Sequence, residues 1–177
     1  SYAILARVNV RHCRAPVCGL GPLAMRELTS FIKAEGNFTH VELNGNRLCE
    51  AAAGSVSQLL SRNDSIMCLD LRDCGMTSSV FARLCTSLAA SNSTLTALNV
   101  SNTGSRGRLN LTLTAVNALK QLLSNHPAMV HLYMSRVGVL AEARTALCEA
   151  VGYGNRLCTL DLGGNMLGTQ CVQQLMT

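Results

Sequence analysis

Apolar residues recur along this chain in one spacing that repeats six times. From Ile66 to Cys74, apolar residues occupy the first, fourth and sixth positions and a cysteine occupies the ninth. The same spacing fits segments that begin near residues 5, 38, 66, 95, 129 and 157. A recurring period of this length indicates tandem structural repeats rather than a set of unrelated elements.

A second apolar pattern, with a step of four residues, follows each of these segments. In the second copy it consists of Leu48, Ala52, Val56 and Leu60, and matching ladders follow the other copies. A step of four keeps one stripe of an α-helix buried. Each copy therefore predicts a short strand, a turn and a helix. One such unit cannot bury enough apolar surface to fold alone, so the copies must stack.

The strand pattern L-x-x-L-x-L-x-x-[N/C] resembles the ribonuclease-inhibitor class of leucine-rich repeats over nearly all of residues 5–177. The resemblance implies an α/β fold: a right-handed solenoid, or horseshoe, with parallel strands on the concave face and helices on the convex face. We expect residues 1–177 to form one domain of about six repeats, the last incomplete. Neither end shows the polar repeat that caps a free solenoid, so we expect a segment of a longer chain, or ends covered by further repeats or neighbouring subunits.

Composition and motifs favour protein binding over chemistry. The chain has 177 residues, is 48% hydrophobic and carries a net charge of +5. No apolar run reaches the ~18 residues of a membrane span, and the mild charge does not by itself indicate a nucleic-acid partner. The sequence contains no phosphate-binding glycine loop, zinc-ligand spacing or serine-hydrolase motif. We therefore expect no enzymatic activity, no catalytic residues, no metal and no cofactor.

Nine cysteines bear on the compartment. The pattern puts Cys13 and Cys74 in the same slot two strands apart, about 9.6 Å, which is beyond the reach of a disulfide. Most cysteines replace small apolar residues of the repeat, which favours a reducing compartment. We expect a cytoplasmic protein, with the cytoskeleton as one setting. Two pairs on neighbouring repeats stay open: Cys18 with Cys49, and Cys148 with Cys171. The use of five glycosylation sequons also stays open, at Asn37, Asn63, Asn92, Asn99 and Asn110.

Four positions of each strand segment, the third, fifth, seventh and eighth, point to the predicted concave face. Glu42 and Asp70 lie side by side there, about 5 Å apart, and in the simpler interpretation Arg72 neutralises them. In the other interpretation they form an acidic patch for a basic partner residue, with Tyr133 as an anchor. The candidate partner-binding residues of this face are His40, Glu42, Asp70, Arg72, Asn99, His131, Tyr133 and Asp161.

His40 beside Cys68 is the one pair on this face that could act as an activated nucleophile. Nothing in the sequence orients His40, and an open sheet excludes little water. We therefore interpret the pair as an exposed thiol near a surface histidine. His131 is three strands from His40, about 14 Å, so the two histidines cannot share a metal.

Arginines gather at the predicted edge where strands turn into loops. They either shield apolar turns or form a docking strip for an acidic protein surface. The candidate partner-binding residues of this loop edge are Arg11, Arg14, Arg47, Arg106, Arg108 and Arg136. Our leading hypothesis is a non-enzymatic protein-interaction or scaffold module in a larger assembly, which binds its partner through the concave face and this edge.

An inserted loop in the fourth repeat carries the alternative function. Thr103-Gly104 and Gly107-Arg108, followed by a leucine-rich helix and H-P-A-M-V-H-L, resemble the GTPase-activating protein of Ran, a family of the same repeat class. In that family an arginine-bearing loop of this kind is essential for stimulating GTP hydrolysis. The resemblance implies that Arg108, or Arg106 next to it, would help to position or stabilise the hydrolytic machinery of a small GTPase.

Overall fold

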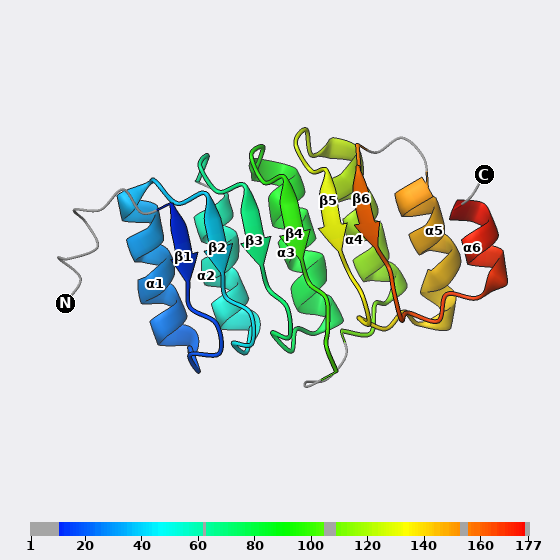
Figure 1. Ribbon diagram of the computed structural model, residues 1–177, viewed down its shortest axis with the longest axis horizontal. Helices are drawn as coiled ribbons and strands as arrows, with labels where there is room; N and C mark the ends of the chain where they lie inside the picture. The colour runs from blue at the N-terminus through cyan, green and yellow to red at the C-terminus, as the bar shows by residue number, and fades with distance from the viewer. Residues whose placement is uncertain (1–10, 62, 105–108, 153–155, 176–177) are drawn as a thin grey trace.

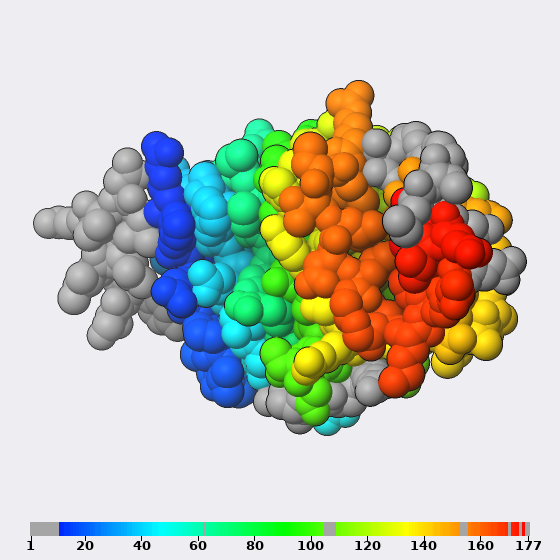
Figure 2. Space-filling view, turned by 45° about the vertical axis from the view of Figure 1, so that its right-hand side comes forward, coloured from blue at the N-terminus to red at the C-terminus, as the bar shows by residue number. Residues whose placement is uncertain are grey.

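The computed structural model describes residues 11–61, 63–104, 109–152 and 156–175. These residues form two layers, with a parallel sheet in front of a row of helices in Figure 1. The strands pair in chain order from the first to the sixth. Figure 2 shows the repeats as successive slabs along the molecule. The predicted α/β architecture is therefore confirmed.

Each repeat contributes a three-residue strand and a helix. The strands are β1 (His12–Arg14), β2 (His40–Glu42), β3 (Cys68–Asp70), β4 (Ala97–Asn99), β5 (His131–Tyr133) and β6 (Thr159–Asp161). The helices are α1 (Pro22–Glu35), α2 (Glu50–Leu60), α3 (Ser78–Ser91), α4 (Leu113–Asn125), α5 (Arg144–Gly152) and α6 (Thr169–Leu175). A short 3-10 helix, η2 (Ala141–Ala143), precedes α5.

The pairing register confirms the predicted alignment of the second to sixth repeats. Leu69 pairs with Leu98, and Leu98 pairs with Leu132, all at the fourth position of their segments. These three side chains are buried. Because successive residues of a strand point to opposite faces of the sheet, the residues on either side of each leucine face away from the helices.

The predicted register of the first repeat is wrong. The sequence pattern places Cys13 level with Cys74, whereas in the structure Cys13 pairs with Val41 at the fourth position. β1 therefore pairs with β2 at an offset of 28 residues, not 33. Cys13 and Ala15 pack against the core where the other repeats hold larger residues, and such small side chains give a weak apolar signal. The predicted segment that begins near residue 5 lies outside the described residues.

Threonine side chains begin two of the central helices and tie them together. The Oγ1 atoms of Thr77 and Thr112 accept hydrogen bonds from the backbone N–H groups of Val80 and Ala115, which caps α3 and α4. The backbone N–H of Thr112 donates to the hydroxyl of Ser78 at 3.0 Å. The starts of neighbouring helices are therefore held in register by polar groups, since an uncapped helix leaves backbone donors unsatisfied.

Buried amide side chains bind the backbone where helices turn back toward strands. Nδ2 of Asn92 donates to the carbonyl oxygen of Leu60 at 2.7 Å, and its Oδ1 accepts from the N–H of Leu95 at 3.0 Å. Nε2 of His126 lies 3.0 Å from the same Oδ1. The N–H of Ala128 donates to Nδ1 of His126 at 3.3 Å, so the neutral imidazole with its proton on Nε2 satisfies both contacts.

These contacts also bear on the glycosylation sequons. A glycan is attached through Nδ2 of asparagine, and Nδ2 of Asn92 is buried and donates to a backbone carbonyl. Asn63 is buried as well. In this fold neither residue can carry a glycan, whereas Asn37 and Asn110 are exposed.

The buried imidazole makes stability depend on pH. Burial lowers the pKa of His126 below its ordinary value of 6.5. As the pH falls through about 6.5, the unfolded chain therefore takes up a proton that the folded chain does not, and the free energy of unfolding decreases until the folded pKa is reached. We expect this decrease between pH 7.5 and 5 in urea unfolding, and a shallower one in His126→Gln. The other described histidines are present in both proteins, so identical slopes would contradict this role of His126.

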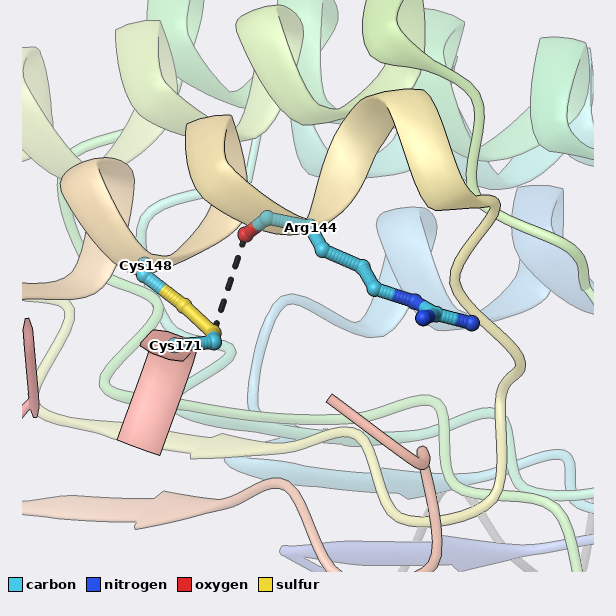
Figure 3. Close-up of a disulfide and its surroundings, with 3 residues drawn as sticks. All are labelled: Arg144, Cys148 and Cys171. Carbon is cyan, nitrogen blue, oxygen red and sulfur yellow. Dashed lines mark hydrogen bonds between the residues drawn. A yellow bond between two sulfur atoms is a disulfide. The ribbon is translucent and has the colours of Figure 1, made fainter. Parts of the chain in front are cut away.

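One of the two open cysteine pairs is formed. Cys148 of α5 and Cys171 of α6 form a disulfide with their Cα atoms 5.8 Å apart, whereas Cys18 and Cys49 are free. Sγ of Cys171 lies 3.7 Å from the backbone carbonyl oxygen of Arg144, while the Arg144 side chain points away from the disulfide (Figure 3). The bond joins the last two described helices across 23 residues of sequence.

Candidate functional site

The face of the sheet turned away from the helices carries most of the predicted partner-binding residues. In β2 to β5 the middle residue of each strand is buried and its two neighbours are half-buried, so these neighbours form what we call the open sheet face. Arg72 follows β3 by two residues. The other seven predicted residues all lie on strands at open-face positions: His40, Glu42, Asp70, Asn99, His131, Tyr133 and Asp161. Their role in binding stays a prediction.

The two neighbouring carboxylates of this face are each paired with an arginine. Glu42 and Asp70 are neighbours in the β2–β3 register. Nε of Arg14 lies 2.9 Å from Glu42, and the Arg72 guanidinium lies 2.6 Å from Asp70. The hydrogen bond to Asp70 raises the pKa of Arg72 above its ordinary value. Exposed pairs of this kind contribute at most about 1 kcal/mol. They do remove the free acidic patch, as the simpler interpretation expected for Asp70.

A pair of histidines stands at one end of the open sheet face. The rings of His12 and His40 are stacked with centroids 4.2 Å apart. The Thr39 hydroxyl donates to the carbonyl oxygen of Arg11 at 3.2 Å and lies 2.9 Å from Nδ1 of His40. A hydroxyl has one proton to donate, so Nδ1–H of His40 donates to Thr39, which fixes the tautomer. The sequence pattern did not indicate His12, because that required the correct register of the first repeat.

Cys68 lies beside His40 as predicted, but its environment does not activate it. The two residues are partners in the β2–β3 register. Burial raises the pKa of the Cys68 thiol, and a hydrogen bond from Thr96 lowers it by less. A nucleophilic cysteine needs a lowered pKa, because the thiolate is the reactive form. These observations favour an ordinary half-buried thiol at this position.

The predicted loop edge is smaller than the sequence suggested. Arg14 lies in β1 on the open sheet face, and Arg11 precedes β1 at the opposite edge, where the strands begin. Both errors follow from the five-residue shift of the first repeat. Arg47 and Arg136 are exposed in the turns after β2 and β5, as predicted. Arg106 and Arg108, on which the GTPase-activator alternative depends, lie outside the described residues.

Two hollows lie next to each other on the open sheet face. The first, the face pocket, has a volume of about 190 Å³ and is lined by His40, Cys68, Asp70, Ala97, Asn99 and Tyr133 among others. The second, the edge pocket, has a volume of about 520 Å³ and lies where β3 to β6 turn into loops; its walls include Arg72, Asn99, Ser101, Tyr133, Arg136 and Asp161. Asn99 and Tyr133 line both hollows, so the two adjoin at these side chains.

The edge pocket exists because the seventh positions become smaller along the sheet. Arg72 holds this position in the third repeat, and the next three repeats place Ser101, Ser135 and Gly163 there. Two serines and a glycine in a row leave a trough beside the large side chain of Arg72. A comparison of the seventh positions of the aligned repeats could have indicated this hollow from the sequence. The shape of its walls could not be predicted in this way, because it depends on how the side chains of Tyr133 and the arginines are oriented.

The described residues include no group of three or more histidine, cysteine or acidic side chains that could hold a metal ion. No described helix is both long and apolar enough to span a membrane. The histidine pair therefore has no third ligand within reach in this part of the chain.

No protein-family model matches this chain, and no curated protein sequence matches it. Among solved structures, the tropomodulin C-terminal domain of Caenorhabditis elegans matches with a TM-score of 0.66 and 13% sequence identity, covering 83% of this chain and 85% of that chain. The Leiomodin-1 Actin-Binding Site 2 matches with a TM-score of 0.58 and 15% identity, covering 88% of this chain and 87% of that chain. At these identities the likeness concerns the fold, which is of the leucine-rich-repeat type.

Proposed function

We propose that this domain is a protein-interaction module, without chemistry of its own, that binds its partner through the open sheet face and the adjoining edge pocket. The observation that supports it best is the pair of adjoining hollows around Tyr133, where half-buried side chains of five neighbouring repeats converge. An aromatic side chain between two hollows is the kind of anchor that dominates protein interfaces. The raised pKa of Cys68 disfavours a catalytic role for the same surface.

The finer picture is also a proposal. We take the open sheet face to be the concave side of a right-handed horseshoe of the ribonuclease-inhibitor-like class, serving as a scaffold in a larger cytoplasmic assembly. One structural neighbour is an actin-binding site of leiomodin, which makes actin and a cytoskeletal setting the first partner to test. The GTPase-activator alternative stays a prediction that depends on Arg106 and Arg108.

Replacing Tyr133 by alanine tests the proposed surface. We expect the domain to bind monomeric or filamentous actin in interferometry and cosedimentation, and Tyr133→Ala to weaken that binding at least about tenfold, as for an interface anchor. Gln121→Ala, an exposed position on α4 behind the sheet, should leave the affinity unchanged. Binding that survives Tyr133→Ala but is lost in Gln121→Ala would contradict the open sheet face. No binding to either form would contradict actin as the partner.

A further inference from the structure

We propose that the open sheet face binds an extended segment of its partner in which one apolar side chain stands about four residues from an acidic side chain. The inference deepens the proposed function and rests on it. The face pocket would take the apolar side chain, and Arg136 in the edge pocket would take the acidic one.

The face pocket has the size for one apolar side chain, and apolar residues such as Val41, Leu69 and Ala97 line it together with polar ones such as His40 and Asn99. Its lining includes the buried Leu69, and the small side chain of Ala97 stands beside Cys68 in the β3–β4 register. A cavity of about 150 Å³ is large enough to bind benzene. A hollow of about 190 Å³ therefore accommodates a leucine, methionine or phenylalanine side chain, and is too small for a typical drug-sized ligand.

Arg136 supplies the uncompensated positive charge of the edge pocket. Among the described residues no carboxylate pairs with it, and its guanidinium makes a long polar contact there, 3.5 Å from Nη1 to the carbonyl oxygen of Thr103. Arg72, in the same pocket, is already bound to Asp70. A guanidinium with free N–H groups matches the two oxygens of a carboxylate. Asp161 lines the far wall over β6, and its charge disfavours an acidic group there, which places the acidic side chain nearer Arg136.

The spacing of the two hollows sets the spacing in the partner. Ala97 lines the face pocket and Ser101 lines the edge pocket, four residues further along the same repeat. An extended chain rises about 3.3 Å per residue and β4 ends at Asn99, so Ala97 and Ser101 lie at most roughly 13 Å apart. In an extended segment lying along the strands, side chains four residues apart point the same way and span this distance.

Gly164 positions the arginine. A Cβ atom added at Gly164 would lie 2.7 Å from Cγ of Arg136, closer than carbon atoms approach without a shift. Gly164 also has φ of +70°, which favours glycine. The Arg136 stem therefore lies over a position where only a hydrogen fits. Gly164→Ala should displace the guanidinium without changing the net charge.

Peptide selection tests the inference. A phage-displayed library of random 16-residue peptides, selected on the whole chain, should enrich sequences with Leu, Ile, Met or Phe four residues from Asp or Glu. Arg136→Glu should replace the acidic preference by a basic one and keep the apolar preference. Ala97→Leu fills the face pocket, so it should remove the apolar preference and keep the acidic one. Lys33→Glu makes the same change of charge at an exposed position of α1 and should select the wild-type motif.

A fluorescein-labelled copy of the most enriched peptide gives the quantitative result. We expect Arg136→Glu to weaken its binding at least tenfold, and Gly164→Ala to weaken it in the same direction, with melting temperatures confirming that each variant folds. Selected peptides without the fixed spacing, or an acidic preference that survives Arg136→Glu, would overturn the inference. If the selected peptides lack the motif but still lose binding in Tyr133→Ala, the inference fails and the proposed function stands. Peptides that ignore both Tyr133 and Arg136 count against both.

Discussion

Replacing Phe81 by alanine is expected to lower the free energy of unfolding by about 3–5 kcal/mol. Phe81 lies in α3 and is fully buried in the hydrophobic core. Truncation removes its buried area from the core and leaves a cavity that neighbouring repeats on both sides cannot fill without moving, because protein interiors are close-packed. Urea unfolding followed by circular dichroism measures the loss.

Leu113 provides the control for this variant. It is 43% exposed at the start of α4, so Leu113→Ala removes little buried area and should cost less than about 1 kcal/mol. Equal losses in the two variants would mean that the core does not pack as described around α3.

Asn92→Ala is expected to be destabilising by about 2–5 kcal/mol although it removes no apolar contact. Each buried backbone group that loses its partner costs about 1–3 kcal/mol, and the carbonyl of Leu60 and the N–H of Leu95 both lose theirs. His126 would also lose the acceptor for its Nε2–H. Urea unfolding at pH 7.5 compares the variant with the wild type.

The control is Asn37→Ala, at an exposed asparagine one residue before the second strand segment, whereas the buried Asn92 lies three residues before the fourth. Its stability should change by less than about 0.5 kcal/mol. A loss as large as that of Asn92→Ala would show that the destabilisation does not come from buried hydrogen bonds.

The sequence was sufficient for the fold wherever leucine or a residue of similar size fills the inward positions. Leu69, Leu98 and Leu132 align as predicted because each sits in an uninterrupted apolar pattern of the same spacing. The prediction fails in the first repeat, where Cys13 and Ala15 take the inward positions. Small residues fit a sheet that packs closely against a helix, but in a sequence they are hard to distinguish from the residues of a turn.

The candidate site was predictable in its positions and not in its pairings. The alternation of strand residues placed Tyr133 and Asp161 on the open sheet face. The ion pair of Arg14 with Glu42 depended on the register of the first repeat, so one shift concealed it and His12 together. Arg72 forms an ion pair with Asp70, whereas Arg136 pairs with no carboxylate of the described residues. This difference depends on the directions of the side chains, which the spacing of residues in the sequence does not encode.

The contact between Cys171 and Arg144 affects how the last two described helices respond to reduction of the disulfide. As half of a disulfide, Cys171 has no proton to donate to the carbonyl oxygen 3.7 Å away. After a reductant cleaves the disulfide, the thiol of Cys171 carries a proton and becomes a weak donor to that same oxygen. α5 and α6 are therefore joined directly in either oxidation state, by the disulfide when it is intact and by a weak hydrogen bond after reduction, so losing the covalent bond need not release the helix that carries Cys171.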